Sequence, residues 1–344
     1  MNDEIQFISE DDLIALTMDI LLQNGCSTVV ARQIAENCVT AERGGSLSHG
    51  VFRIDGYVRT LRSGWVDGSA VPVLNDMAPG FIAVDAKNGF AQPALSLARE
   101  AFVEKIKGNG IALLGIGNAH HFSSLWPDIL PFAESGFIAL SMVNSFACSV
   151  PQGAKSSVLG TNPIAFAAPV DGQPPLVFDF ATTTMAHGDI QIAAKEGRKL
   201  PAGTGVDCNG DLTDDPDAIL NGGALVPFGG HKGSAISLMI ELLTAGLSGG
   251  NFSFEFDWST HPGAETPRTG QIIIGIDPSY CGQGNGLSLR AVTLMKMLED
   301  AGFDARPGLR RHRLSLERRE TGIPLKTSQL THLRALAVGA ARPD

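Results

Sequence analysis

The sequence predicts a mixed α/β fold that does not follow the Rossmann pattern. Short runs of β-forming residues alternate with stretches of helical character, which disfavours an all-β sandwich. The one strand-to-helix glycine motif, Gly115-Ile-Gly117-Asn-Ala-His120, lacks the third glycine of the dinucleotide fingerprint, and no acidic residue follows about 20 positions later at a strand end. No GxxxxGK[ST] phosphate loop occurs either. A bound dinucleotide would therefore need a different scaffold.

The first 60 or so residues are expected to form a helical module. Ser9 caps a first helix that stops at Asn24-Gly25, and Ser27 caps a second that ends at Gly44-Gly45. A third helix is expected over 48–62. The residues that follow define the α/β body of the chain.

The α/β body shows short strands separated by helices. The expected strands are 81–85, 111–116, 137–144, 164–169, 176–180 and 271–277. The expected helices are 92–107, 124–135, 186–197, 232–247 and 287–301. Segments 200–230 and 249–270 are rich in Gly, Pro, Asp and Asn, so we expect long ordered loops there.

Composition narrows the class of protein. A formal net charge of −10 disfavours nucleic acid and anionic membranes as partners, so a small molecule is the expected ligand. Five cysteines without a CxxC spacing fit neither a disulfide framework nor a zinc knuckle. The acidic N-terminus and the lack of an apolar run near 18 residues disfavour export and membrane spans, and we expect a cytoplasmic protein.

The stretch SLSHGVFRIDGY contains the most informative pair of side chains. His49 offers a proton-transfer imidazole, and Arg53 offers a guanidinium that holds a carboxylate through two hydrogen bonds. If Ser48 caps the third helix, the two residues stand at i and i+4 on one face. The pair suggests a small 2-oxo or 2-imino acid. The alternative that stays open is a capping His and an Arg paired with Asp55 or a distant acid.

Two further motifs bring polar side chains to element ends. Asp189 lies in the first turn of an expected helix, where simple helix-start electrostatics is the alternative explanation. His120 and His121 directly follow a strand, a usual place for ligand contacts. Because no HExxH or HxH spacing supplies further metal ligands, we expect no bound metal.

Two basic segments suggest phosphate recognition. Gly229-Gly230 allow close backbone approach, and His231-Lys232 place positive charge at the start of an apolar helix. A glycine turn with a solvated Lys is the alternative. Around a Pro-Gly turn, three arginines are candidates for clamping a 2′-phosphate, which would favour NADP(H) over NAD(H). They are Arg306, Arg310 and Arg311.

The chain resembles the malate/L-lactate dehydrogenase family of the L-sulfolactate dehydrogenase-like fold over about residues 10–330. The resemblance rests on motifs that occur in a shared order: SHGVFR, NAHHF, GTNPIAFAAP, DFATTTMAHGDI, LPAG and PFGGHKGSAISLMIELLTAGLSGG. It implies a non-Rossmann α/β fold with a mixed or antiparallel sheet as cofactor domain, helical N- and C-terminal parts, and a homodimer. Within the family, HHFSSLWPD, AHGDIQIAAKEGRKLPAG and GGNFSFEFDW look most like the NADPH-dependent Δ1-piperideine-2-carboxylate/Δ1-pyrroline-2-carboxylate reductases.

The resemblance also implies roles for individual residues. Ser48, His49 and Asp189 would form the proton relay, and Arg53 and Thr161 would hold the substrate. The implied cofactor contacts are His121, Phe122, Ser123, Ser124, Leu125, Asp179, Phe180, Ala181, His231, Lys232, Arg306, Gly308, Arg310 and Arg311. Where the hydroxyacid members tend to read HFG and GKI, this chain reads HFS and GDI. These departures argue against simple malate or lactate oxidation.

We therefore expect NADPH-dependent reduction of a cyclic imino acid, with His49 as proton donor. An Asp189 carboxylate near His49 would raise the pKa of the imidazole. The domain expectation is a substrate-side part, 1–110, joined by 286–344, and an NADPH-binding part, 111–285, whose segment 137–170 packs on the substrate side. The alternatives are a 2-hydroxy acid dehydrogenase on the same scaffold, a metal-assisted hydrolase using His120, His121 and Asp128, and a non-catalytic dinucleotide-binding protein.

Overall fold

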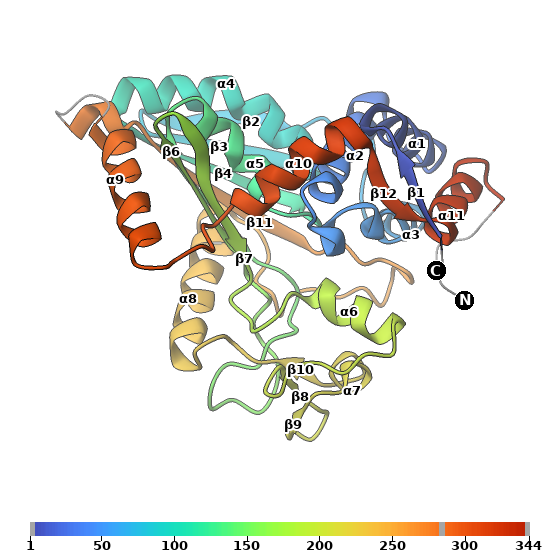
Figure 1. The fold of residues 1–344 in the computed structure, drawn as a ribbon. Helices are drawn as coiled ribbons and strands as arrows, with labels where there is room; N and C mark the ends of the chain where they lie inside the picture. Colours follow the sequence, from blue (N-terminus) through green and yellow to red (C-terminus); the bar gives the residue numbers. More distant parts are fainter. Residues whose placement is uncertain (1–3, 282–285, 341–344) are drawn as a thin grey trace.

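A seven-stranded mixed sheet forms the centre of the protein in the computed structural model, which describes residues 4–281 and 286–340 (Figure 1). Neighbouring strands follow the order β2 (Val73–Ala78), β3 (Phe81–Phe90), β4 (Ile111–His120), β11 (Arg268–Ile276), β5 (Ile138–Val143), β6 (Ile164–Val170) and β7 (Gln173–Phe180). Only β3 and β4 run parallel among these pairs; the other neighbours are antiparallel. The mixed sheet confirms the predicted fold class.

Helices cover both faces of this sheet. On one face, α4 (Ala91–Asn109) and α5 (Trp126–Glu134) bury a continuous apolar core against the strands. On the other face, Ile240 of α8 (His231–Glu241) packs on Met142 and Ile272. The helix predicted over 232–247 continues from α8 as one π-helical turn, Leu242–Gly246. A 3-10 turn, Pro278–Cys281, and α9 (Gly286–Asp300) follow β11.

The first two predicted helices are confirmed together with their caps. In α1 (Glu10–Gln23), the Ser9 hydroxyl accepts the Asp12 backbone N–H, and in α2 (Thr28–Arg43) the Ser27 hydroxyl accepts that of Val30. A side-chain oxygen at this position satisfies an amide that the helix leaves unpaired, which explains why both helices begin where the sequence predicts.

The prediction of a third helix over 48–62 is wrong in its first half. Two 3-10 turns, Leu47–His49 and Val51–Arg53, precede α3 (Ile54–Arg62). Gly50 separates the turns with φ −91° and ψ −138°, so His49 and Arg53 do not share one face of an α-helix. The physical reason is packing, because a Cβ atom on Gly50 would lie only 2.0 Å from Glu42 Oε2. This turn is therefore held by α2 behind it.

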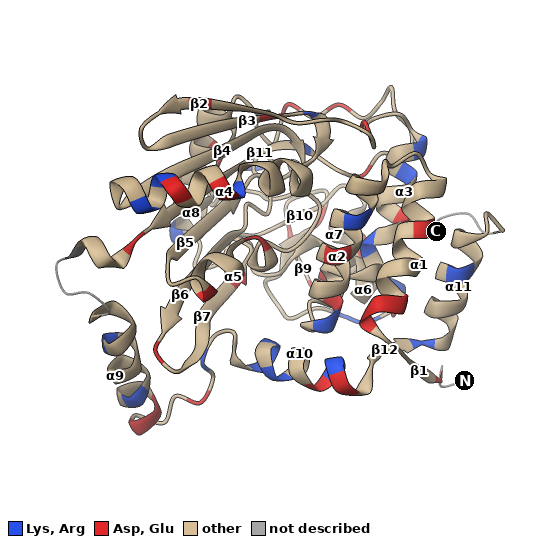
Figure 2. Ribbon diagram, turned by 90° about the horizontal axis from the view of Figure 1, so that it is seen from above, with Lys and Arg blue, Asp and Glu red and all other residues tan. Residues whose placement is uncertain are grey.

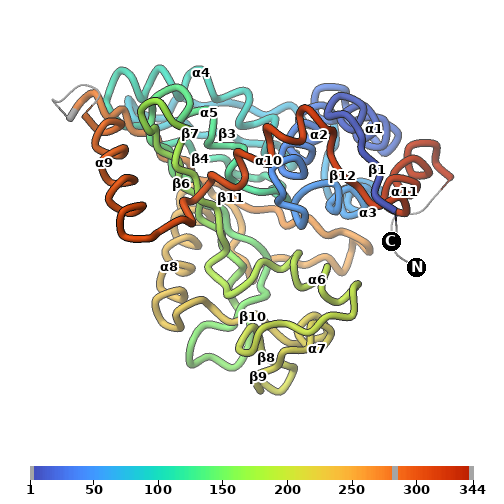
Figure 3. Tube along the Cα trace, viewed as in Figure 1, coloured from blue at the N-terminus to red at the C-terminus, as the bar shows by residue number. Residues whose placement is uncertain are grey.

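The C-terminal segment returns to the N-terminal helices (Figures 1 and 3). From α9, the chain crosses the molecule as α10 (Leu309–Thr321), β12 (Ile323–Lys326) and α11 (Thr327–Ala337). Strand β12 pairs antiparallel with β1 (Ile5–Ile8). The sequence did not predict β1, because its pairing partner lies more than 300 residues away along the chain. Their side chains share one core with α1 and α2. The domain division stays a prediction, and its boundary at 110 falls between β3 and β4, which are hydrogen-bonded neighbours.

A small lobe lies below the sheet in the view of Figure 1. It contains α6 (His187–Lys195), α7 (Pro216–Leu220) and a sheet of β8 (Gly205–Val206), β9 (Leu212–Thr213) and β10 (Ala224–Leu225). The segment predicted as a long loop over 200–230 thus carries three short strands and a helix. In the described part of the chain, no helix has both the length and the apolar character needed to cross a membrane.

Candidate active site

A cavity of about 540 Å³ gathers most of the predicted site residues and is the candidate active site. Its walls come from the turns around His49, the β4–α5 loop, the end of β7, the start of α6 and the loop before β11. The predicted site residues that line it are Ser48, His49, Arg53, His121, Phe122, Ser123, Ser124, Leu125, Thr161, Asp179, Phe180, Ala181, Asp189 and Arg311. Segments far apart in the sequence therefore meet at one place.

His49 is the imidazole at the centre of this cavity wall. The Ser48 hydroxyl is hydrogen-bonded to His49 Nδ1 at 3.0 Å. Burial lowers the pKa of His49 well below its usual value, and the positive charge of Arg53 and the neighbouring His121 lower it further. The predicted rise in the pKa of His49 through Asp189 is therefore wrong, because burial and Arg53 outweigh it. The negative charge of Asp189 acts on Arg53. The free protein therefore holds His49 as a neutral ring.

The turn that carries His49 rests on a buried carboxyl group. Glu42 is 3% exposed, and its Oε2 accepts the Val51 backbone N–H at 2.9 Å. Burial raises the pKa of Glu42 to about 7. Glu42 thus fixes the backbone between the two 3-10 turns and, through it, the direction of the His49 side chain.

Arg53 is a buried charge that forms no ion pair with a described residue, although the negative charges of Glu265 and Asp189 act on it and raise its pKa against the effect of burial. Its side chain makes no hydrogen bond or ion pair with any described residue, although Arg53 is only 8% exposed. The guanidinium lies 4.3 Å from the centroid of the Phe122 ring, and burial lowers its pKa. A buried charge is costly unless it is paired, so this guanidinium is poised for an anionic ligand.

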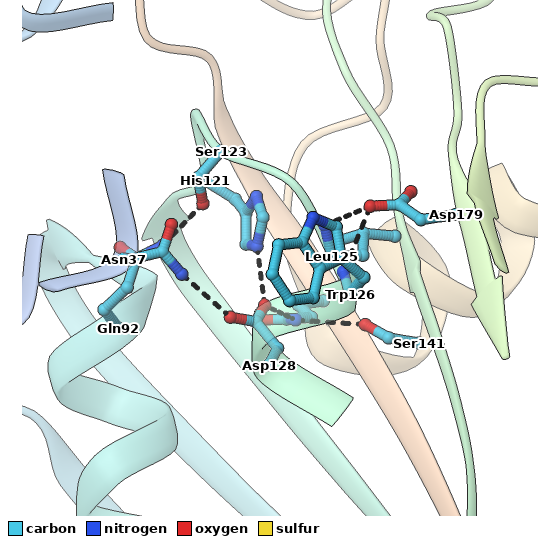
Figure 4. A network of polar contacts seen from close by, with 10 residues as sticks. Asn37, Gln92, His121, Ser123, Leu125, Trp126, Asp128, Ser141 and Asp179 are labelled. Carbon is cyan, nitrogen blue, oxygen red and sulfur yellow. Dashed lines mark hydrogen bonds and ion pairs between the residues drawn. The ribbon is translucent and has the colours of Figure 1, made fainter. Parts of the chain in front are cut away.

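His121 belongs to a buried polar network (Figure 4). His121 Nε2 and Gln271 Nε2 donate to the same Asp128 oxygen at 2.9 Å and 2.8 Å. Asn37 Nδ2 donates to the other oxygen at 3.4 Å. His121 also lines the cavity. From the sequence, Asp128 is a candidate only in the hydrolase alternative. No local sequence pattern indicates that an acid on α5 pairs with a histidine in the preceding loop.

The metal alternative finds no support in this arrangement. His120 points into the core, where its Nδ1 lies 2.8 Å from Thr266 Oγ1 and its Nε2 lies 3.1 Å from Asn88 Oδ1. His121 and Asp128 are paired with each other. Across residues 4–281 and 286–340, no group of three or more His, Cys, Asp or Glu side chains is arranged to hold a metal ion.

Asp179 fixes the loop between β4 and α5. Its Oδ2 accepts the backbone N–H groups of Leu125 and Trp126 at 2.8 Å and 3.0 Å (Figure 4). Burial raises the pKa of Asp179. Next to it, Phe180 is 45% exposed and offers an apolar ring at the cavity edge. The end of β7 and the loop therefore form one rigid wall.

Thr161 reaches the cavity from the loop before β6. Its carbonyl accepts the Thr182 backbone N–H at 2.8 Å. The following residue, Asn162, has a φ of 37° and anchors this loop by donating to Glu241 Oε1 at 2.8 Å. The loop is thus held from both sides, with Thr161 in the cavity lining.

Of the three arginines near the Pro-Gly turn, the structure brings Arg311 to the cavity. The Arg311 guanidinium lies 4.7 Å from the centroid of the Trp126 ring, and a Cβ atom on Gly44 would come within 2.9 Å of its side chain. Arg306 instead donates to Gln173 and to the Pro174 carbonyl, while Arg310 is exposed. Figure 2 shows basic positions along α10, which lies between α9 and β12.

Besides Arg306, four predicted cofactor residues lie outside the cavity lining. Gly308, with a φ of 87°, packs against Val177 of β7 and sets where α10 begins. His231 and Lys232 are exposed at the start of α8, after a turn with positive φ at Gly229 and Gly230. Arg310 is the fourth. Their contacts with a cofactor stay predictions.

Sequence reasoning missed several residues that line the cavity. His187, the first residue of α6, has its pKa lowered to about 4 by burial and by Arg53. Its ring lies 5.0 Å from the centroid of Phe146, which in turn contacts Trp258 at 5.4 Å. Trp258 Nε1 is buried and has no hydrogen-bond partner among the described residues. The only sequence signals were a histidine at a helix start and an aromatic-rich loop.

Comparison with known proteins assigns the scaffold. Residues 8–334 match the family described as malate/L-lactate dehydrogenase. The chain belongs to this family. It is 55% identical over 332 residues to the Δ1-pyrroline-2-carboxylate/Δ1-piperideine-2-carboxylate reductase of Pseudomonas syringae pv. tomato, covering 96% of each chain. The resemblance found in the sequence motifs is therefore confirmed.

Solved structures of this family share the fold. The crystal structure of Δ1-piperideine-2-carboxylate reductase from Pseudomonas syringae gives a TM-score of 0.94 at 55% identity, covering 96% of this chain and 99% of that one. Sulfolactate dehydrogenase from Methanocaldococcus jannaschii gives 0.86 at 26% identity, covering 97% of both chains. Membership of a dehydrogenase family implies a nicotinamide cofactor, held on a non-Rossmann scaffold.

Proposed function

We propose that this member of the malate/L-lactate dehydrogenase family reduces Δ1-piperideine-2-carboxylate to L-pipecolate and Δ1-pyrroline-2-carboxylate to L-proline, with NADPH as the reductant. The observation that carries the proposal is Arg53, a buried and unpaired guanidinium in the same cavity as His49. A small carboxylate with a proton-accepting atom next to it fits this pair. The reductases with which the chain shares 55% identity act, by name, on these two imino acids.

Arg53 binds the substrate carboxylate in this proposal. A planar guanidinium forms two parallel hydrogen bonds to a carboxylate, which fixes the ligand in one orientation. Thr161, on the cavity wall, contributes a hydroxyl to the same ligand. Fixing the carboxylate also fixes the adjacent C2 atom, the carbon that must accept hydride.

His49 supplies the proton to the imine nitrogen. Since Arg53 is one cause of the lowered pKa of His49, a bound carboxylate that neutralises Arg53 raises the pKa of the imidazole again. Substrate binding thus charges the donor at the moment it is needed. Ser48 orients the ring through its 3.0 Å hydrogen bond, and Asp189 completes the proposed relay from the start of α6.

The cavity fits a nicotinamide cofactor. The loop 121–125, held by Asp179, presents backbone groups beside the apolar Phe180 ring, and the N-terminus of α5 begins at this loop. When bound, the cofactor supplies the hydride that reduces C2. His121 keeps a fixed orientation through Asp128, so the cavity wall does not have to rearrange around the ligand.

Arg311 supports the choice of NADPH. It lines the cavity, and its guanidinium lies 4.7 Å from the centroid of the Trp126 ring. A 2′-phosphate on the ribose offers this group a doubly charged partner, whereas NADH does not. Arg306, committed to Gln173 and Pro174, would contribute only by holding the turn before α10.

We also propose a homodimer in the cytoplasm. Exposed apolar side chains follow α8 and α9, the two helices at one edge of the molecule in Figure 1. They are Leu238, Met239, Leu242, Leu247, Leu289, Leu294 and Met297. A second copy covering this edge would remove them from water. Four cysteines, Cys26, Cys38, Cys148 and Cys208, are free thiols, which suits a reducing compartment.

NADPH oxidation with a panel of substrates tests the function. The panel contains both cyclic imines, pyruvate and oxaloacetate, each with NADPH and with NADH. We expect the imines with NADPH to give the highest kcat/KM. Preference for a 2-oxo acid would replace the proposal with a 2-hydroxy acid dehydrogenase.

A further inference from the structure

A second, smaller pocket adjoins the reaction cavity. It measures about 210 Å³ and lies between α3 and α6, with Leu220 of α7 at its far side. Arg53, Phe122, Gln191 and Glu265 line both this pocket and the larger cavity. The two spaces are therefore separated only by a wall of side chains.

Phe122 and Glu265 form this wall on the α3 side, and a glycine makes room for them. A Cβ atom on Gly56, inside α3, would lie 2.5 Å from Glu265 Oε2 and 2.7 Å from Phe122 Cε1. Glycine within a helix costs about 1 kcal/mol relative to alanine, so the close approach has a structural use here. Glu265 is also paired with Arg59 at the rim.

The side pocket has a basic side chain at its outer wall, Lys195, and another at its inner wall, Arg53. Lys195 is exposed at the outer wall, with its Nζ 5.5 Å from the Phe52 ring centroid and no ion pair to a described residue. Both acids in the lining are already paired, Glu265 with Arg59 and Asp55 with His332 at 2.9 Å. The two charges of the pocket that form no ion pair with a described residue are thus Lys195 outside and Arg53 inside, although Glu265 also attracts Arg53 through space.

We propose that this side pocket is the access route for the imino-acid substrate, with Lys195 as the first carboxylate contact and the Phe122 side chain, on its fixed loop, as the partition that the substrate passes. The inference rests on the proposed function. The cofactor side of the cavity, at Phe180 and Arg311, lies on a different part of the wall. Substrate and product would therefore exchange through the α3–α6 side while the cofactor stays in place.

The test measures association rates rather than turnover. Stopped-flow tryptophan fluorescence follows the binding of pyrrole-2-carboxylate, a planar unreactive carboxylate, to the NADP⁺-saturated protein. Ala194→Trp fills the side pocket, and Ala194→Ser is the matched control at the same position. Because an obstructed route slows both directions, we expect kon and koff to fall together by about tenfold, with Kd changed by less than about twofold.

A charge reversal gives an independent readout. Lys195→Glu should lower kon about threefold to tenfold at low salt, and the difference should vanish in about 0.5 M salt. Lys199→Glu makes the same charge change on the same lobe but outside the pocket, and should leave kon nearly unchanged. Unchanged kon in both Ala194→Trp and Lys195→Glu overturns the route, as does a failure of the wild-type protein to bind the probe. A wild-type protein that binds the probe but reduces no imine would instead contradict the proposed function.

Discussion

Gly188 leaves the space that the Arg53 guanidinium occupies. A Cβ atom on Gly188 would lie 2.6 Å from Arg53 Nη2 and 3.1 Å from Ser48 Cβ. Gly188 is buried in the first turn of α6, directly before Asp189. The small lobe can therefore close on the SHG turn only because residue 188 has no side chain, and the position of Arg53 depends on it.

Gly188→Ala should displace Arg53 while leaving the helix intact, since alanine favours α6 more than glycine does. A displacement near 1 Å at a substrate-positioning group costs up to about 100-fold in rate. We expect kcat/KM for the imines to fall by 10- to 100-fold, mainly through KM. Gly197→Ala, which meets no atom within 4 Å but has a φ of 63°, controls for general strain in the same lobe. Equal kinetics in the wild type and Gly188→Ala would contradict the tight fit.

His49→Ala should lower kcat by about 10²- to 10⁴-fold if His49 is the general acid. Circular dichroism and the melting temperature show whether the fold survives. His187→Ala is a matched control, because it removes another cavity imidazole that has no hydrogen bond to a described residue. If His187→Ala reduces kcat more than His49→Ala does, the proton donor is misassigned.

The pH dependence should differ between kcat/KM and kcat. In the free protein the pKa of His49 lies well below 6.5, so the protonated fraction falls as the pH rises through neutrality. We expect kcat/KM to fall by about tenfold per pH unit from about 6.5 to 8.5. In the complex, the neutralised Arg53 raises the pKa of His49, so kcat should decline at a higher pH. A kcat/KM profile that is flat over this range would rule out a proton-bearing His49.

Arg311→Gln should erase much of the preference for NADPH. Losing a charge-assisted pair to a 2′-phosphate costs about 1.5–3 kcal/mol, or roughly 10- to 100-fold in the ratio of kcat/KM for NADPH to that for NADH. Arg310→Gln, an exposed neighbour outside the cavity lining, serves as the control. A ratio that survives in Arg311→Gln would locate the recognition elsewhere, with His231 and Lys232 as the next candidates.

Glu42 should make folding stability pH-dependent. Its pKa rises from 4.5 to about 7 on folding, so the neutral form is favoured in the native state. The free energy of unfolding therefore has its full contribution from neutral Glu42 below pH 4.5. This contribution is lost as the pH rises to about 7, which lowers the free energy of unfolding by about 2–4 kcal/mol. Glu42→Gln cannot ionise and should lack this decrease. Urea unfolding at pH 5 and pH 8 measures it, and parallel pH dependence in both proteins would show that Glu42 is ionised in the native state.

The sequence by itself determined the local features of this protein. Ser9 and Ser27 begin their helices as predicted, because a cap depends on atoms within three or four residues along the chain. Six of the seven strands of the central sheet were predicted for the same reason, through runs of β-forming residues bounded by Gly, Pro or Asp, whereas the edge strand β2 was not predicted. The ordered motifs also indicated the family, and the SHG and HHF segments indicated where the cavity wall lies.

Only the tertiary structure decided what these side chains experience. Burial and neighbouring charge lower the pKa of His49, where the sequence suggested the opposite through Asp189. Gly50 breaks the third helix because Glu42, on another helix, fills the space beside it. Arg53 is left without a partner, and Asp128 meets His121, through contacts between separate elements. Solvation and Coulomb energies depend on every group brought near in space, which the order of residues along the chain does not display.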